Sequence, residues 1–270
     1  MKVLIIILFS VITHSVFGQL KISGIVEQSD GSIVSYANIG IRNKNVGTVS
    51  NEKGEFTILI PQNFLNDTLS FSCVGFEELN LKIKNIIQNK LNIFQLTQKN
   101  IELKEVIVLS KQLKTVKIGV KSYSPFITSP SINTKNQDIY EFAQFININD
   151  KPSLIISTII MLFTKQADTA TFRINFYNIK DGLPFKKIFE KNIIERSPVS
   201  KGWITIDLSK YNIKFHNNFF IGFEFLPDDK IHSFNYGARI GGYVIARQNS
   251  LGNWIKQKGG SVSCYITAKQ

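Results

Sequence analysis

The sequence predicts an all-β protein made of two antiparallel sandwiches, and three observations support this fold class. Short runs of Val, Ile, Phe, Thr and Tyr recur at roughly ten-residue spacing between clusters of Gly, Asn, Asp and Pro. Long helical periodicity is nearly absent. Of the 270 residues, 43% are hydrophobic and 21 are Phe, which is enough apolar material for two cores.

Residues 1–18 have the layout of a cleavable secretory signal peptide. Lys2 precedes an apolar run from Val3 to Ile12, and the small residue Gly18 comes directly before Gln19. The apolar run is shorter than the roughly 20 residues that a membrane-spanning helix needs. We therefore expect cleavage after Gly18, export to the periplasm, the outer-membrane surface or the medium, and no transmembrane span in the mature chain.

The first block, residues 19–99, is predicted to hold seven strands. Gly31 and Gly54 are predicted turn residues, because glycine tolerates backbone angles that strain other residues. About seven strands in some 80 residues fit a small sandwich of the transthyretin or immunoglobulin type. The predicted strands are Lys21–Val26, Asn38–Ile41, Gly47–Ser50, Glu55–Ile60, Thr68–Val74, Glu78–Ile83 and Asn92–Thr97.

The pattern changes over residues 100–136, which we interpret as a linker and loop between two domains. This stretch begins with the segment Glu102–Val108, continues with scattered lysines and ends in the Pro- and Ser-bearing loop Ser124–Asn136. A second strand-rich block, residues 137–270, follows it.

In the second block, Leu154–Phe163 is predicted as a central strand buried on both faces, because the run is too short to cross a membrane. Thr171–Tyr177 alternates, with Phe172, Ile174 and Phe176 facing inward. Further inward sets and two hairpin turns complete a predicted jelly-roll-like sandwich. The inward sets are Ile204, Ile206 and Leu208, then Phe219, Ile221, Phe223 and Phe225; the turns are Asp181–Gly182 and Gly241–Gly242.

Three motifs of the first block, taken in order, resemble the carboxypeptidase-regulatory-like domain. They are GIVEQSDGSIVSYANIGI (Gly24–Ile41), GTVSNEKGEFTI (Gly47–Ile58) and LSFSCVGFEE (Leu69–Glu78). The resemblance implies a transthyretin-like sandwich of the kind common at the front of exported Bacteroidetes proteins. It does not imply peptidase activity, because this domain is an appendage to the peptidase.

Two further stretches carry weaker likenesses. The phrase ELKEVIV (Glu102–Val108) is similar to the segment that follows this domain in TonB-dependent transporters, although 270 residues are too few for a plug and barrel. We interpret it as a last strand and linker, with a periplasmic docking peptide as the alternative. Phe172–Ile194 and Gly202–Ile213 resemble a sandwich found behind this module in other short envelope proteins.

Several chemistries are disfavoured by the sequence. The net charge of +12 comes from lysines spread along the chain rather than gathered in a stripe, so we expect no nucleic-acid partner. His216 and His232 lie in no His/Glu ligand motif, so we expect no catalytic zinc. Asp228–Asp229 is interpreted as a turn rather than a calcium site. No nucleophile elbow or phosphate loop is present, and we expect neither an enzyme nor a cofactor.

Strand alternation places each of the two cysteines in a core. Cys73 shares a face with Leu69 and Phe71, and Cys264 shares one with Val262 and Ile266. Since the two cores are separate, we expect both thiols to be free.

A ligand site is predicted on the polar face of the second sandwich. Arg173, Asn175, Tyr177, Trp203 and Glu224 would share that surface if their strands are neighbours, and aromatic rings with planar polar groups suit a sugar. The alternative is an ordinary solvent-exposed face. We therefore expect a non-catalytic exported binding or scaffold protein of the cell envelope with a glycan or envelope-protein partner. An accessory subunit of a TonB-dependent uptake system, pairing through a strand or residues 102–108, is the alternative.

Overall fold

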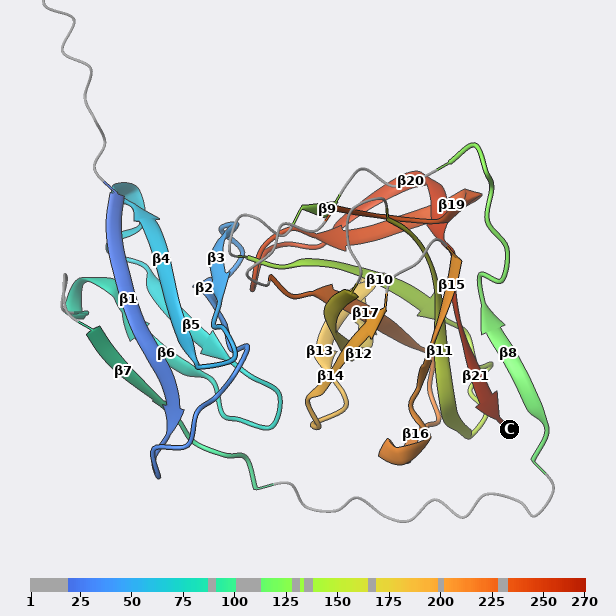
Figure 1. Ribbon diagram of the computed structural model, residues 1–270, viewed down its shortest axis with the longest axis horizontal. Coiled ribbons are helices and arrows are strands. Elements are labelled where there is room, and N and C mark those ends of the chain that lie inside the picture. Colours follow the sequence, from blue (N-terminus) through green and yellow to red (C-terminus); the bar gives the residue numbers. More distant parts are fainter. Residues whose placement is uncertain are drawn as a thin grey trace, which may run out of the picture.

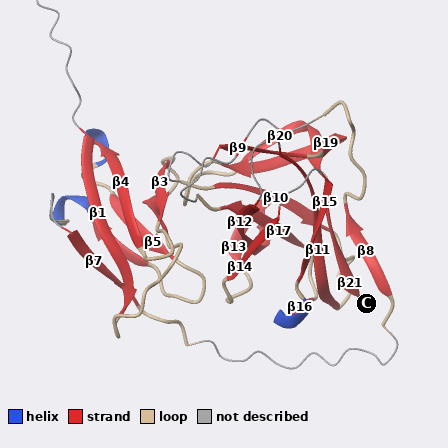
Figure 2. Ribbon diagram, in the orientation of Figure 1, coloured by secondary structure: helices blue, strands red, loops and turns tan. Residues whose placement is uncertain are grey.

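A computed structural model describes residues 19–86, 91–100, 113–127, 132–133, 138–164, 169–198, 202–227 and 233–270. Strands dominate these residues, joined by loops and a few short 3-10 turns (Figure 2). The 3-10 turns are η1 (Gln62–Phe64), η2 (Ile83–Asn85) and η4 (Ser209–Tyr211). The predicted signal peptide lies outside the described residues.

The first sandwich packs a three-stranded sheet, in the order β4-β1-β7, against a four-stranded sheet, in the order β3-β2-β5-β6. All neighbouring strands are antiparallel except β1 and β7, which are parallel. The seven predicted strands are confirmed, with ends that shift by at most two residues. Their bounds are β1 (Gln19–Gln28), β2 (Asn38–Ile41), β3 (Val46–Val49), β4 (Glu55–Pro61), β5 (Thr68–Ser72), β6 (Leu79–Lys82) and β7 (Leu91–Leu96).

Alternation in these strands sends one side of each sheet into a shared core. Phe56, Phe71 and Phe94 meet at its centre, where the rings of Phe71 and Phe94 stack with centroids 4.4 Å apart. Cys73 lies buried in this core, as predicted. Gly31 and Gly54 have φ of 83° and 73°, which confirms that both occupy turn conformations that favour glycine.

The second sandwich packs two larger sheets. The junction sheet, which faces the first sandwich, has the order β13-β12-β17-β10-β19-β20, with β14 also paired to β12. The distal sheet has the order β8-β21-β11-β18-β9, with β15 and β16 also paired to β11, and lies on the far side (Figure 1). Both sheets are antiparallel.

The strands of the second sandwich follow one another along the chain with several crossings between the sheets, as in a jelly roll. Their bounds are β8 (Thr115–Gly119), β9 (Ile132–Asn133), β10 (Tyr140–Ile146), β11 (Ser153–Thr164), β12 (Thr169–Lys180), β13 (Leu183–Lys187), β14 (Ile193–Pro198), β15 (Gly202–Asp207), β16 (Ile213–Phe215), β17 (Phe219–Phe225), β18 (Ser233–Tyr236), β19 (Ala238–Arg247), β20 (Ile255–Val262) and β21 (Cys264–Lys269).

The core of the second sandwich confirms the predicted inward faces. The alternate residues of β12, β15 and β17 that were expected inward are all buried in it, and Cys264 joins them. β11 is central, with strands paired along both of its edges, as predicted for Leu154–Phe163.

Two local predictions, the extent of the linker and one of the two hairpin turns, differ from the structure. The interval 100–136 contains β8, which pairs with β21, and β9, which pairs with β18, so strands of the second sandwich begin inside the predicted linker. Asp181–Gly182 forms the tight turn between β12 and β13, as predicted, with φ of 53° and 70°. Gly241–Gly242 was wrongly predicted as a hairpin turn: the pair is a bulge within β19, where the register to β20 shifts.

Candidate functional site

Four charged side chains form one row across four neighbouring strands of the junction sheet. Arg173 of β12 lies opposite Glu224 of β17, Glu224 opposite Glu141 of β10, and Glu141 opposite Arg247 of β19. Both glutamates and Arg173 are fully buried, and Arg247 is 8% exposed. We call these four residues the charged row; its two negative charges lie between its two positive ones.

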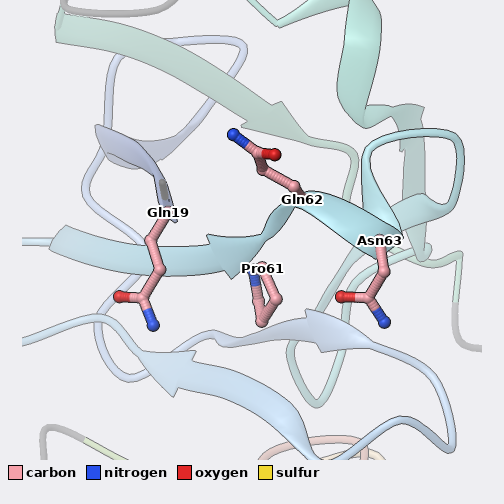
Figure 3. A pocket seen from close by; sticks show the side chains of 4 residues that line it. All are labelled: Gln19, Pro61, Gln62 and Asn63. Atoms are coloured by element: carbon pink, nitrogen blue, oxygen red, sulfur yellow. The ribbon is translucent and has the colours of Figure 1, made fainter. Parts of the chain in front are cut away.

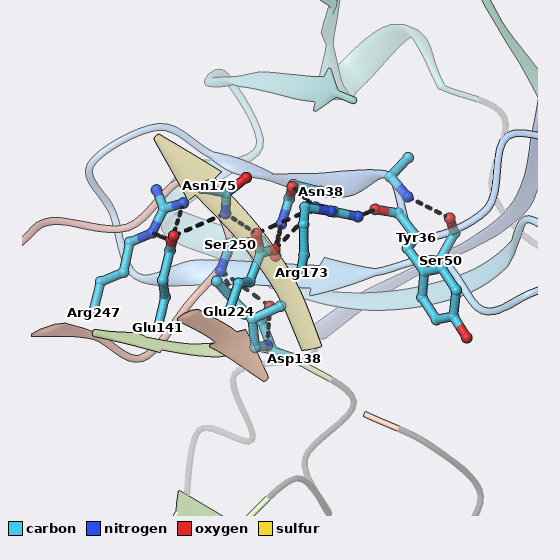
Figure 4. A network of polar contacts seen from close by, with 12 residues as sticks. Tyr36, Asn38, Ser50, Asp138, Glu141, Arg173, Asn175, Glu224, Arg247 and Ser250 are labelled. Atoms are coloured by element: carbon cyan, nitrogen blue, oxygen red, sulfur yellow. Dashed lines mark hydrogen bonds and ion pairs between the residues drawn. The ribbon is translucent and has the colours of Figure 1, made fainter. Parts of the chain in front are cut away.

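Each glutamate of the charged row is paired with the arginine beside it (Figure 4). Arg173 Nη1 lies 3.1 Å from Glu224 Oε1, and Arg247 Nη2 lies 2.6 Å from Glu141 Oε2. Asn175 bridges the two carboxylates, since its Nδ2 donates to Glu141 Oε1 at 2.8 Å and to Glu224 Oε2 at 2.7 Å. The hydroxyl of Tyr177 donates to Glu141 Oε1 at 2.7 Å. The formal charges of the row therefore cancel inside the protein.

The first sandwich covers this row and adds hydrogen bonds to it. Asn38 of β2 donates through Nδ2 to Glu224 Oε1 at 2.6 Å and accepts at Oδ1 from Arg173 Nη1 at 2.8 Å. The carbonyl oxygen of Tyr36 accepts from Arg173 Nη2 (Figure 4). The row is thus the polar centre of the contact between the two domains.

The loop of residues 248–254, between β19 and β20, forms a second part of this contact. The Ser250 amide donates to both carboxylate oxygens of Asp138, at 3.0 and 3.1 Å, and its hydroxyl accepts from Asn38 Nδ2 at 3.1 Å. The Asn43 amide of the β2–β3 turn donates to the Leu251 carbonyl at 3.0 Å. The loop is therefore fastened to both domains.

Three glycines make this close approach sterically feasible. Gly40 and Gly47 lie opposite each other in β2 and β3, and a Cβ on either would lie 2.8 or 2.7 Å from the Ser250 carbonyl oxygen. In β17, a Cβ on Gly222 would lie 2.5 Å from Glu141 Oε1 and 2.9 Å from the Tyr177 ring. Real Cβ atoms do not come that close, so these positions need glycine to let the loop and the charged row pack.

Smaller contacts between the two domains add to the junction. An apolar cluster joins Tyr36 and Val49 of the first domain to Ile139 and Leu226 of the second. Lys99 Nζ lies 3.1 Å from Glu190 Oε2, an ion pair between half-exposed side chains that contributes little by itself.

Burial and neighbouring polar or charged groups have opposing effects on the pKa values of the ionisable side chains at the junction. Burial by itself would raise the pKa of Glu224, but the charges of Arg173, Lys187 and Arg247 outweigh it and lower that pKa to about 2. Burial is the largest influence on Lys187 as well, and it lowers the pKa of that amine to about 8 despite the attraction of Glu224. Burial raises the pKa of Asp138, although hydrogen bonds from Ser250 and Ile139 oppose it.

The arrangement suits a contact between domains, because its charged groups are buried and bonded to one another. A nucleophile or general base must reach its substrate, whereas the carboxylates of the charged row are buried and already accept hydrogen bonds from Arg173, Asn175, Tyr177 and Asn38. Desolvating such charges costs several kcal/mol per ion, so the ion pairs of the row add little net stability even though removing one partner would be costly.

The predicted ligand residues separate into two groups. Arg173, Asn175, Tyr177 and Glu224 do share one face of neighbouring strands, but the expectation that this face is open was wrong, because the first domain and residues 248–254 cover it. Trp203 lies on β15 in the distal sheet and does not join them.

Sequence reasoning missed Glu141, Arg247 and Asn38. Glu141 carries a signal that could have found it, since it is the single charged residue of the largely apolar strand Tyr140–Ile146, at a position that faces away from the core. Nothing in the sequence around Asn38 distinguishes a buried junction residue from an ordinary strand asparagine.

Trp203 lies on an open surface that we call the aromatic face, defined by outward side chains of β8, β21 and β15. Trp203 is 37% exposed and meets Tyr265 edge to face, with ring centroids 5.5 Å apart. Lys117 Nζ lies 5.7 Å from the centroid of the Tyr265 ring. Exposed or half-exposed hydroxyls and a carboxylate surround these rings; they belong to Thr205, Asp207 and Thr267.

The remaining candidate residues and one surface hollow give less support for a functional site. His216 is exposed just after β16, while His232 and Asp228–Asp229 lie outside the described residues. Within the described part of the chain, no group of three or more His, Cys, Asp or Glu side chains is placed to hold a metal ion. A hollow of about 450 Å³ is lined by Gln19, Pro61, Gln62 and Asn63, which carry neutral amides and a proline ring (Figure 3).

Fold and junction together define a protein of two β-sandwiches joined through a buried polar contact. Over residues 22–108 the chain matches the family model of the CarboxypepD_reg-like domain, so its first sandwich is a domain of this family. The match includes residues 102–108, which lie outside the described residues. No curated protein matches the chain. Over the described ranges, no helix is both long and apolar enough to cross a membrane.

Proposed function

We propose that this chain is a non-catalytic, exported binding protein of the cell envelope, and that its aromatic face binds a glycan. The observation that carries the proposal is the exposed Trp203, held edge to face against Tyr265 on a sheet surface that also carries the exposed side chains of Thr205 and Asp207.

The chemistry of the aromatic face suits a sugar. Sugar rings offer C–H groups that stack on aromatic rings, and hydroxyls that need planar or hydroxyl partners. Thr205 and Asp207 lie on the same side of β15 as Trp203, since alternate residues of a strand share a face. Stacking and hydrogen bonding are therefore available within one strand, and Tyr265 and Lys117 extend the surface sideways.

The junction supports the non-catalytic part of the proposal. The buried acids and bases of the charged row are used in the contact between the domains, with Glu224 and Glu141 each bonded to an arginine. We interpret the first domain as a rigid support that orients the aromatic face away from it. In Figure 1 the strands β15, β11, β21 and β8 lie on the side opposite the first sandwich.

A second function is favoured by one observation. Residues 102–108 fall inside the matched domain, and β7, the last described strand before them, is an edge strand of its sheet. An edge strand can accept a strand from a partner. An accessory subunit of a TonB-dependent uptake system is therefore the alternative proposal.

The test is affinity electrophoresis in native gels that contain soluble β-glucan, xylan, mannan or dextran. We expect at least one of these polysaccharides to retard the protein, and Trp203→Ala to abolish the retardation while leaving the melting temperature nearly unchanged. Phe185→Ala is the matched control, since Phe185 is 48% exposed on β13 and lies outside the aromatic face.

Two results would count against the glycan proposal. One is migration unaffected by every polysaccharide. The other is a Trp203→Ala variant that loses binding together with several kcal/mol of stability, which would make Trp203 a packing residue, since truncating a core tryptophan costs about 3–5 kcal/mol.

A further inference from the structure

The last 40 residues of the chain differ in charge from the rest. Residues 231–270 contain five lysines and arginines and no aspartate or glutamate, although the whole chain has 20 acidic residues. Arg247 is buried and paired with Glu141. The other cations are exposed, and three of them lie on β19 and β20: Arg239, Lys256 and Lys258.

These three cations belong to an exposed two-stranded segment that we call the edge ribbon, residues 239–243 of β19 and 255–259 of β20. Every residue of both stretches is exposed, whichever side of the strand it occupies. β20 ends the junction sheet, and β10 pairs with β19 only over Ile245–Arg247. The edge ribbon therefore projects beyond the sheet.

The edge ribbon combines its cations with uncovered apolar side chains. Tyr243 lies opposite Lys258, and Lys256 Nζ lies 4.4 Å from the centroid of the Tyr243 ring. Ile240 and Ile255 are 64% and 60% exposed. Leaving such side chains in water has a free-energy cost that burial would recover.

Protection of a sheet edge explains only part of this composition. Lysines on an edge strand discourage pairing with another chain, and Lys256 and Lys258 fit that purpose. Exposed isoleucines have the opposite effect, so Ile240 and Ile255 need another explanation. A surface that is at once anionic and able to take up apolar side chains accounts for both kinds of residue.

We propose that the edge ribbon docks this protein on the surface of an anionic phospholipid membrane. Lysine and arginine are attracted to anionic headgroups, while isoleucine enters the boundary between headgroups and acyl chains. Tyr243 suits the same boundary, because its ring is apolar and its hydroxyl is polar. A nucleic acid or an acidic polysaccharide would satisfy the cations but would not bury the isoleucines. The inference is independent of glycan binding, which involves the distal sheet.

The experiment is sedimentation of the purified protein with vesicles of phosphatidylcholine alone and of phosphatidylcholine with a quarter phosphatidylglycerol. We expect binding to the anionic vesicles only, weakened by added salt because the attraction is screened. Reversing three charges (Arg239→Glu, Lys256→Glu and Lys258→Glu together) should lower the partition coefficient by at least about tenfold. Ile240→Ser with Ile255→Ser should lower it by about tenfold as well.

Matched controls come from the first domain. Lys53→Glu with Lys82→Glu and Lys84→Glu makes the same change in net charge at exposed sites. Leu91→Ser with Ile93→Ser removes two apolar side chains that are each 61% exposed. Both control variants should bind anionic vesicles like the unaltered protein, and circular dichroism should show that all four variants are folded.

Three outcomes would overturn the proposal. The first is equal sedimentation with both kinds of vesicle. The second is a loss of binding in the control variants as large as in the ribbon variants. The third is a dependence on the three cations without any effect of the isoleucine changes, together with equal binding to soluble heparin, which would identify the edge ribbon as a site for a polyanion instead of a membrane.

Discussion

The two outer faces of the second sandwich are both built from strands with alternating side chains, yet one face is buried and the other is open to solvent. The face of the junction sheet carries the charged side chains Arg173, Glu224, Glu141 and Arg247, and it is buried. The aromatic face of the distal sheet carries Trp203 and Tyr265 and is open. Polarity therefore does not say which face meets solvent.

The difference follows from what covers each face. Charges can be buried when each finds a partner, and the register of the junction sheet places an arginine beside each glutamate, while Asn175 bridges the two adjacent glutamates. Alternation along one strand shows which residues share a face. It does not show whether a second domain lies on that face.

Removing one partner of the charged row should produce the largest effect. Arg173→Met leaves the Glu224 carboxylate buried with fewer partners, and we expect a loss of about 3–5 kcal/mol in the free energy of unfolding. Urea unfolding followed by circular dichroism measures it. On the aromatic face, Lys117→Met should change stability by no more than about 0.5 kcal/mol. Similar losses in both variants would remove the distinction between the two faces.

Adding one methyl group under the charged row should have a smaller effect. Gly222→Ala places a Cβ 2.5 Å from Glu141 Oε1, so we expect a cost of about 1–3 kcal/mol from overpacking, even though alanine suits a strand better than glycine does. The control is Gly260→Ala, where a Cβ would meet its neighbours at 3.5 Å or more. If the two variants are equally stable, the junction is looser than described.

The pH dependence of stability tests Lys187. Its pKa in the folded protein is about 8, below the ordinary value of 10.5, so the unfolded chain binds the extra proton between these pH values and the contribution of this lysine to stability should rise with pH there. The buried cysteines and Tyr177 have raised pKa values and change stability in the opposite direction, so the contribution of Lys187 is measured as the difference in unfolding free energy between the unaltered protein and Lys187→Met. We expect this difference to shift by about 1–2 kcal/mol in favour of the unaltered protein between pH 8 and pH 10, because the side chain is only half-buried. The exposed Lys186→Met should show the same pH dependence as the unaltered protein.

The two cysteines provide the smallest expected signal. Both are buried in separate cores, and burial raises the pKa of each thiol, that of Cys264 to about 12. A thiol reagent should therefore label almost nothing in the native protein and two sulfurs per chain after denaturation without reductant. Labelling of fewer than two after denaturation would contradict the placement of the thiols.

Local patterns predicted most of the fold. Period-2 alternation located the seven strands of the first sandwich and the inward faces of β12, β15 and β17, because side-chain direction in a strand depends only on neighbouring residues. The bulge at Gly241–Gly242 was missed, because two glycines suit a hairpin turn and a bulge equally well. β8 was missed because it is a short, partly exposed edge strand between Lys114 and Lys121, and such a stretch resembles a linker.

The candidate site could be predicted only in part. Arg173, Asn175, Tyr177 and Glu224 were grouped correctly on one face, since grouping needs only alternation and strand adjacency. Their burial depends on Asn38 and residues 248–254, which are far away in sequence. Glu141 and Arg247 join the row because of the register in which β10 pairs with β17 and β19. The sequence of one strand alone does not predict its register with a strand that is distant in the sequence.

The coupling between the two domains through Asn38 tests the central claim most directly. A double-mutant cycle with Asn38→Ala and Glu224→Gln would measure it by urea unfolding of the four proteins. If the charged row is a domain junction, the two substitutions should be coupled by about 0.5–3 kcal/mol, since Asn38 Nδ2 lies 2.6 Å from Glu224 Oε1. Additive effects, with a coupling energy near zero, would contradict the junction and restore this polar face as a candidate ligand site.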